Sequence, residues 1–256
     1  MTAELVSAIS LYGPKPEPLR TVLASIQGTA AAHLGAEFVP YTLDQVHGTL
    51  VVLTGWRDAT GIVINEDFLE YRGERREMDF GALQEILRAH LAEPMRIRIG
   101  GFGPATPEPF SSQGRPLHER SFTAQAGGLV LIGWPVAALE SAGRVQPLER
   151  LRREMTAAGV LHRYHRRPSD VDDDFHLVVG HYAGAPPDRV AAAVSTTRDY
   201  LAAHPVDVAL GLDQVRIIAS DTPTLASLRF SSGLPVPPAR VAALYRATVP
   251  PQMGVV

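Results

Sequence analysis

A histidine and a hydroxyl residue stand two positions apart in a segment whose composition is typical of a β-strand. His47 and Thr49 lie within Val46–Leu53, which is otherwise apolar except for one glycine. Successive side chains point to opposite faces of a strand, so we expect the His47 imidazole and the Thr49 hydroxyl on one face. The alternating residues are mostly apolar and predict the face that packs on the core.

A second segment of the same kind follows in the other half of the chain. His176 lies within Phe175–Gly180, and its alternating neighbours are apolar. Val178 is expected to share the face of His176. The chain therefore offers two imidazoles, each on a strand and each on the side away from apolar packing.

Two imidazoles that face one cleft have a direct chemical use. Imidazole titrates near neutral pH, so one ring can remove a proton from a nucleophile while the other protonates a leaving oxygen. A nearby hydroxyl can donate to a phosphate oxygen as negative charge develops on it. This arrangement indicates in-line displacement at phosphorus without a metal.

Both halves of the sequence predict the same order of elements, in which a proline opens the first helix and a glycine ends it. In the first half we expect a strand at 8–12, a helix at 18–34, a strand at 46–53, a helix at 83–91 and a strand at 95–99. In the second half we expect a strand at 128–133, a helix at 147–158, a strand at 175–180, a helix at 188–203 and one or two strands within 206–218. The repeated order indicates an internal duplication without residue identity.

We therefore predict an α+β protein with a bilobal, pseudo-twofold duplicated fold. Antiparallel sheets carry a helix layer, and the two histidine strands face a central cleft. One lobe is expected at 1–105 and the other at 120–235, with a C-terminal tail at 236–256, all within a single bilobal domain of 1–256. Strands and helices can cross between the lobes.

Three segments lack the periodicity of helices or strands. The charge-rich residues 57–80 predict a surface excursion, and the residues 100–118, rich in glycine, proline and serine, predict a loop. The proline-containing residues 249–253 predict a frayed terminus.

Composition narrows the function classes. The 256 residues contain no cysteine, which excludes disulfides, thiol nucleophiles and cysteine-bound metals. A formal net charge of −3 does not favour binding of long nucleic acid by charge neutralisation. No apolar run is long enough for a membrane helix, and the N-terminus lacks the pattern of a secretion signal, so we expect a cytoplasmic protein. We find no P-loop, no dinucleotide-binding glycine motif and no serine-hydrolase elbow.

The order of elements and the segment His47-Gly48-Thr49 resemble the 2H phosphoesterase superfamily, which includes the 2′–5′ RNA ligase-like cyclic phosphodiesterases. The resemblance implies a metal-independent phosphodiesterase acting on a 2′,3′-cyclic phosphate or a 2′–5′ phosphodiester of a nucleotide or RNA end. It implies that His47 and His176 form the general acid–base pair and that Thr49 binds the phosphate. It implies no cofactor and no metal, and we expect a monomer.

The second motif departs from the family pattern. Val178 stands where the family has threonine or serine, and His181 stands where many members have arginine. Loss of one oriented donor costs roughly 10²–10³ in rate. We expect Val178 to line the pocket and Tyr12, Arg98 and His181 to be candidates for substrate binding. Arg166 and Arg167 are further candidate donors.

For several of these histidines, a structural role competes with a chemical one. His181 falls on the opposite face from His176 unless a bulge intervenes, which favours a structural role for it. His162 and His165, followed by the acidic run 172–174, could suggest a metal site, but two histidines alone are a weak zinc signal. We expect them in a solvated, mobile loop beside the cleft.

Three other functions stay open at the level of the sequence. The first is a nucleotide-binding protein of 2H fold whose catalysis is impaired by the altered second motif. The second is a 2H-fold enzyme acting on a small organophosphate other than RNA. The third is a metal-dependent hydrolase that uses the histidines at 162 and 165.

Overall fold

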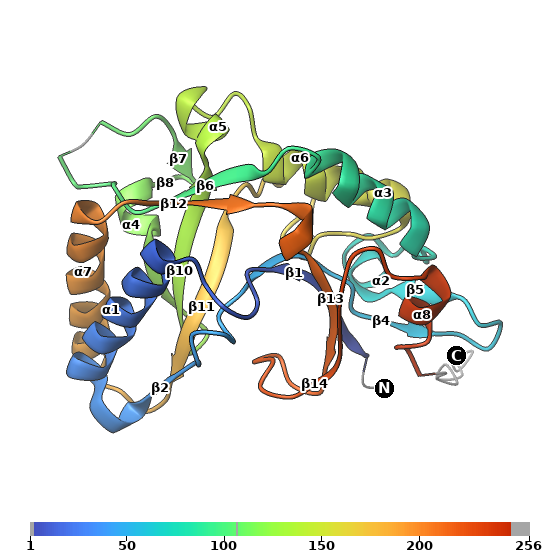
Figure 1. The fold of residues 1–256 in the computed structure, drawn as a ribbon, viewed down its shortest axis with the longest axis horizontal. Coiled ribbons are helices and arrows are strands. Elements are labelled where there is room, and N and C mark those ends of the chain that lie inside the picture. Colours follow the sequence, from blue (N-terminus) through green and yellow to red (C-terminus); the bar gives the residue numbers. More distant parts are fainter. Residues whose placement is uncertain (1–2, 106, 247–256) are drawn as a thin grey trace, which may run out of the picture.

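The computed structural model describes residues 3–105 and 107–246 and has an α+β fold (Figure 1). Ten strands form one antiparallel sheet. Along the sheet the order is β12 (Val206–Leu210), β6 (Met95–Ile99), β10 (Gly128–Pro135), β11 (Phe175–Tyr182), β3 (Gly48–Val52), β1 (Leu5–Ser10), β13 (Arg216–Ser220) and β14 (Leu228–Gly233). Beside this path, β2 (Phe38–Pro40) pairs with β11 and β9 (Phe122–Gln125) pairs with β10. The two small pairs are β4 (Gly55–Arg57) with β5 (Val63–Asn65), and β7 (Ser111–Ser112) with β8 (Arg115–Pro116).

Two pairs of helices pack on the sheet, α1 on β11 and α6 on β3 among their contacts. In Figure 1, α1 and α7 lie side by side on the left of the molecule, and α3 and α6 lie together on the right. The α-helices are α1 (Glu17–Leu34), α2 (Glu66–Arg72), α3 (Phe80–His90), α4 (Leu117–Arg120), α5 (Val136–Glu140), α6 (Pro147–Glu154), α7 (Pro187–Ala203) and α8 (Pro238–Ala242). Short 3-10 turns cover Gly35–Glu37, Met155–Ala158 and Leu212–Gln214.

Helix α1 illustrates how the sequence determines these elements. A proline stands in its first turn, where the backbone N–H needs no partner. Its apolar residues recur at helical spacing and form one stripe. The buried residues of α1 are Leu19, Val22, Leu23, Ile26, Ala30 and Leu34, the same six that the sequence predicts. The prediction of this helix and of its buried face is confirmed.

Strands β2 and β3 act as one interrupted strand along the same edge of β11. β2 pairs with the last residues of β11, from Gly180 to Tyr182, and β3 meets β11 through Leu177 opposite Gly48. Residues 41–47 leave the sheet between these two pairings and return to it. The excursion ends at His47, directly before β3.

The α+β class and the antiparallel sheet are confirmed, whereas the internal duplication and the pseudo-twofold axis stay predictions. The segment 57–80 is more than a surface excursion, because it contains β5 and α2 and buries Asn65 and Phe68. The segment 100–118 includes β7, β8 and the start of α4, so the prediction of a plain loop was wrong in part.

Part of the predicted C-terminal tail packs on the core. Helix α8 lies within it, and Tyr245 is buried and donates a hydrogen bond to the carbonyl of Leu53 over 2.7 Å. The residues 249–253, for which we predict fraying, lie outside the described residues.

Gly48 and Phe175 interlock the two motif strands on the core side of the sheet. A Cβ atom added to Gly48 would overlap the ring of Phe175, and Phe175 is fully buried. The phenyl ring therefore occupies the space where a side chain at position 48 would stand. Gly48 follows His47 and Phe175 precedes His176, so each histidine is next to a residue that packs against the other strand.

Gly48→Ala should destabilise the protein by about 1–3 kcal/mol, because the ring of Phe175 cannot move freely out of a packed core. Gly28→Ala is the matched control: Gly28 lies in α1 with open space around it, and alanine there should stabilise by about 0.5–1 kcal/mol. Urea unfolding of both variants measures the difference. Equal stabilities would show that the contact between the strands is not tight.

Candidate active site

One pocket of about 200 Å³ collects the histidines of both motifs. Its walls come from β3, from β11, from α6, from the loops near residues 41 and 223, and from the connecting segment (residues 159–174) between α6 and β11. The lining residues are Tyr41, His47, Thr49, Val52, Arg152, His162, Arg163, Tyr164, His176, Val178 and Pro223. The structure therefore brings together the four motif residues that the sequence singled out.

The register between β3 and β11 explains this meeting. Leu177 lies opposite Gly48 in an antiparallel pair, and both of these residues are buried on the core side. Continuing the register places His176 opposite Thr49 on the other face. The two imidazoles then stand on a diagonal, with backbones roughly 7–8 Å apart.

A turn before β3 orients the imidazole of His47. Its Nδ1 lies 2.8 Å from the carbonyl oxygen of Gln45, so Nδ1 carries the proton and donates it. The ring of Tyr12 lies 6.3 Å away, centre to centre. Burial, the largest cause, lowers the pKa of His47, and Lys15 lowers it further, against the opposing carbonyl of Gln45. The neutral ring is therefore favoured, with Nε2 free to accept a proton.

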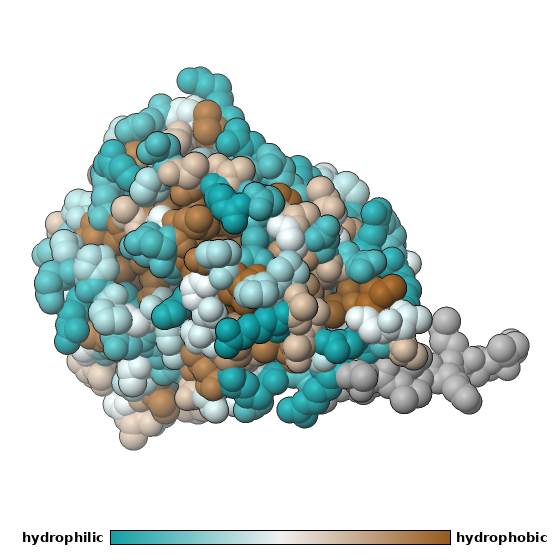
Figure 2. Space-filling model, turned by 45° about the vertical axis from the view of Figure 1, so that its right-hand side comes forward, coloured by the Kyte–Doolittle hydropathy of each residue, from teal (hydrophilic) through white to brown (hydrophobic). Residues whose placement is uncertain are grey.

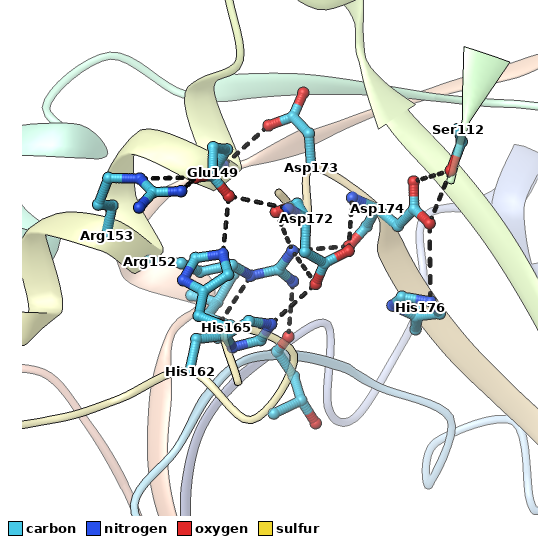
Figure 3. A network of polar contacts seen from close by, with 12 residues as sticks. Ser112, Glu149, Arg152, Arg153, His162, His165, Asp172, Asp173, Asp174 and His176 are labelled. Atoms are coloured by element: carbon cyan, nitrogen blue, oxygen red, sulfur yellow. Dashed lines mark hydrogen bonds and ion pairs between the residues drawn. The ribbon is translucent and has the colours of Figure 1, made fainter. Parts of the chain in front are cut away.

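His176 stands beside a buried carboxylate. The Oδ2 atom of Asp174 lies 4.0 Å from Nε2 of His176, and the imidazole is 17% exposed. Asp174 is held from other elements by Arg120 at 2.5 Å and by the indole N–H of Trp134 at 2.6 Å. Ser112 donates to the same carboxylate at 2.7 Å (Figure 3). The carboxylate is thus fixed in place before any ligand binds.

Arg152 of α6 lies between the two motif strands, and it was absent from the sequence-based candidates. Its side chain is 1% exposed. Nε donates to the carbonyl of Leu50 at 3.2 Å, and Nη1 donates to the carbonyl of Asp174 at 3.0 Å. Leu50 is the extra residue of a bulge against β1, so its carbonyl needs such a partner. One guanidinium therefore joins the backbone beside both histidines.

The carboxylate of Asp172 neutralises this guanidinium. Its Oδ2 atom accepts from Arg152 Nη1 at 2.9 Å and lies 2.8 Å from Nε2 of His162. Burial alone would raise the pKa of Asp172, but Arg152 and His162 hold it far below its usual range. Burial, with help from Arg152, lowers the pKa of His162 to about 3. The floor of the pocket is therefore a charged pair with a neutral imidazole beside it.

The prediction of a solvated, mobile loop around His162 and His165 was wrong. Each side chain is 3% exposed, and Nε2 of His165 lies 2.7 Å from a Glu149 carboxylate oxygen. Arg72 donates to the carbonyl of His165 at 2.7 Å and ties the connecting segment to α2. The polar side chains of His162 and His165 therefore bind buried carboxylates of the protein and do not face solvent (Figure 3).

The two histidines of the connecting segment serve different carboxylates, those of Asp172 and Glu149. Within residues 3–105 and 107–246, no group of three His, Cys, Asp or Glu side chains is placed to hold a metal ion. The hypothesis of a metal site at this position has no geometric support.

Tyr164 stands at the rim of the pocket. Its ring lies 5.6 Å from that of His176 and 5.5 Å from that of His162, and the residue is 41% exposed. Other exposed apolar side chains in the described part of the chain lie elsewhere, at Val39, Leu69, Val145 and Val171. On the face shown in Figure 2, hydrophobic residues form several separate patches between hydrophilic ones.

Arg98 lies away from the pocket. It belongs to β6, which is separated from β11 by β10, and it forms an ion pair with Asp207 of β12. The prediction that Arg98 binds substrate gains no support from this position. Tyr12 is adjacent to His47 but does not line the pocket, and Arg166 instead lies over the ring of Tyr71, 5.1 Å from its centre.

His181 reaches the site indirectly. A bulge places Val179 as an extra residue in β11, because Leu129 pairs with Gly180 and Val130 with Val178. After this bulge the side chains of β11 point to the opposite faces from those expected by simple alternation. His181 therefore lies on the same face as His176. Its Nε2 lies 2.5 Å from the hydroxyl of Tyr41, which lines the pocket.

Searches of known protein families and of curated proteins find no match. Similar solved structures include TT0787 of Thermus thermophilus, which is 16% identical over 90% of this chain and 97% of that chain, with a TM-score of 0.41. The conserved protein of unknown function ATU0111 from Agrobacterium tumefaciens str. C58 is 11% identical over 86% and 82%, with a TM-score of 0.45. Kluyveromyces marxianus Usb1, solved with uridine monophosphate, is 10% identical over 91% and 97%, with a TM-score of 0.36.

These three TM-scores are below 0.5, so the similarities carry no argument about this chain. Among the described residues, no helix combines the length and the apolar character that crossing a membrane requires.

Arg152→Met should lower the free energy of unfolding by about 3–5 kcal/mol, because it leaves the carboxylate of Asp172 buried without its guanidinium. Arg150→Met is the matched control on the same helix: Arg150 is 71% exposed and pairs only loosely with Glu154, at 4.0 Å. The control should stay within about 0.5 kcal/mol of the wild type. Denaturant titration measures both, and a small loss in Arg152→Met would contradict the role given to this side chain.

Proposed function

We propose that this chain is a phosphodiesterase that cleaves a 2′,3′-cyclic phosphate or a 2′–5′ phosphodiester of a nucleotide or RNA end. The observation that carries the proposal is the shared pocket, which His47, directly before β3, lines together with Thr49 of β3 and His176 and Val178 of β11. The motif residues resemble those of 2H phosphoesterases. The shared pocket supports the proposal independently of that resemblance.

The pocket suits hydrolysis of a cyclic phosphodiester. A water oxygen forms a bond to phosphorus, and the bond from phosphorus to one ring oxygen breaks. One imidazole takes a proton from the water, and the other gives a proton to the departing oxygen. Thr49 is proposed to donate to a non-bridging oxygen, where charge builds up.

Fixed charge is available beneath the reacting phosphate. The guanidinium of Arg152 lines the pocket, and its backbone partners keep it in place. A preorganised charge in a site that excludes water acts more strongly than the same charge in solvent. Asp172 balances this charge, so we propose that the guanidinium acts through its fixed donors and in this way offsets part of the loss of a hydroxyl at Val178.

Wild-type protein should hydrolyse 2′,3′-cyclic nucleotides in the presence of EDTA. His47→Ala and His176→Ala should each lose nearly all turnover, because each removes one proton carrier, while the melting temperature changes by only a few degrees. His33→Ala is the matched control, since His33 lies in the last turn of α1 and does not line the pocket. If either motif variant kept wild-type turnover, the pair mechanism would be wrong.

Val178→Thr separates the enzyme from a protein that only binds nucleotides. Threonine has nearly the shape of valine and adds a hydroxyl on the pocket side. In an enzyme that lacks one donor, kcat should rise, by up to roughly 10²–10³. In a protein that binds without catalysis, only the Kd would change. A screen of small cyclic organophosphates alongside the nucleotides tests the remaining alternative substrate class.

A further inference from the structure

The charged groups around the two histidines differ, because carboxylates are present beside His176 and an ammonium acts on His47. His176 faces the carboxylates of Asp172 and Asp174 and the guanidiniums of Arg152 and Arg120. The Asp174 carboxylate approaches the imidazole to 4.0 Å. Each guanidinium is itself bound to one of these carboxylates, at 2.5 Å for Arg120 and 2.9 Å for Arg152. Among the ion pairs of the described residues, His176 takes part in one, and its partner is the carboxylate of Asp174.

His47 has a positive neighbour. Lys15, the one lysine of the chain, is 7% exposed and donates to the carbonyls of Gly13 and Asp44. Asp44 precedes Gln45, whose carbonyl holds His47. The ammonium is thus built into the turn that orients this imidazole.

We propose that Asp174 and Lys15 are positioning residues that divide the roles of the two histidines, so that His176 is the proton donor in hydrolysis and His47 is the proton acceptor. The assignment rests on the proposed function for its reaction, but the unequal protonation of the two rings does not need a substrate. A carboxylate beside His176 stabilises its cation, and an ammonium beside His47 destabilises its cation.

Each proton has a defined course in this scheme. The attacking water bonds to phosphorus and releases a proton to Nε2 of His47, which is free because Nδ1 donates to Gln45. The bond between phosphorus and the leaving oxygen breaks, and that oxygen receives the proton of His176. Exchange with solvent then returns both rings to their starting states.

The pKa values support the same direction. Burial lowers the pKa of both imidazoles and is the largest cause for each. At His176 the carboxylates of Asp172 and Asp174 oppose this change more strongly than Arg152 and Arg120 add to it. At His47, Lys15 adds to the change, and the pKa of Lys15 itself is lowered to about 8 by burial, so the ammonium is charged at neutral pH.

The first experiment is an NMR titration of the free protein with labelled histidine, using His47→Gln and His176→Gln to assign the two signals. The result expected is that His176 titrates at a higher pH than His47. Asp174→Asn should lower the pKa of His176, and Lys15→Met should raise the pKa of His47, each by roughly one pH unit. Lys15→Arg should restore the wild-type titration because it keeps the positive charge.

The second experiment is the pH profile of kcat/KM for a 2′,3′-cyclic nucleotide. Loss of the Asp174 carboxylate should move the alkaline limb to lower pH, and loss of the Lys15 charge should move the acid limb to higher pH. Both variants therefore narrow the bell. If His47 instead had the higher pKa of the two rings, the same changes would shift the opposite limbs and widen the bell.

Asp173→Asn is the matched control for the carboxylate. Asp173 is 7% exposed on the same segment, accepts from the backbone N–H of Glu149 at 2.9 Å, and has its pKa raised to about 7 by burial. It is not among the groups that face His176, so His176 should titrate as in the wild type. If Asp174→Asn does not fold, Arg120→Gln replaces it, and this variant should raise the pKa of His176.

The inference is overturned if His176 titrates at a lower pH than His47. It is also overturned if neither Asp174→Asn nor Arg120→Gln changes the pKa of His176. Both results are compatible with phosphodiesterase activity. The expected titrations without any turnover would instead reject the proposed function and keep the unequal protonation of the two rings. The two failures are therefore distinguishable.

Discussion

The guanidinium of Arg152 joins the two strands that carry the histidines. β3 and β11 meet at Leu177 and Gly48, and beyond this point their carbonyls need other partners. Arginine offers five donors in a rigid fork, so one side chain can bind the carbonyl of Leu50 on β3 and that of Asp174, directly before β11. The carboxylate of Asp172 keeps the charge from being unpaired in the interior. The distance between the imidazoles depends on this contact, together with the packing of Phe175 on Gly48.

The three consecutive aspartates before β11 extend this connection in three directions. Asp172 binds Arg152 of α6, Asp173 caps the first turn of the same helix, and Asp174 binds Arg120 of α4. Each side chain fastens the start of β11 to a different part of the fold. A ligand in the pocket therefore meets groups that are already oriented, which lowers the entropy lost on binding.

Much of the fold could be predicted from periodicity. The stripe of α1 and the alternation from Val46 to Leu50 are local signals, and the structure preserves both. The bulge at Leu50 then turns Val52 to the pocket, against the expectation that it faces the core. The burial of the connecting segment could not be predicted in this way. A run of arginine, histidine and aspartate normally indicates solvent, and it becomes buried here only because its charges find partners that are distant in sequence.

The same limit applies to the candidate site. His47, Thr49, His176 and Val178 could be found because two short motifs contain them, whereas Arg152 has no motif and is recognised only by its contacts. The face on which His181 lies depends on a bulge at Val179, and the sequence gives no clear signal for an extra residue in a strand. Arg98 illustrates the converse, since its strand was predicted correctly while its partner Asp207 lies on an element far along the chain.

The presence of a single lysine in this chain has a practical consequence for chemical labelling. Apart from the amino terminus, a reagent selective for amines has one target, Lys15, which is 7% exposed and bound to the turn before His47. Its pKa of about 8 makes the unprotonated, nucleophilic amine accessible under mild alkaline conditions. The rate of acylation at this single position would report how often the turn opens, and protection by a ligand would report occupancy of the adjoining pocket without an introduced probe.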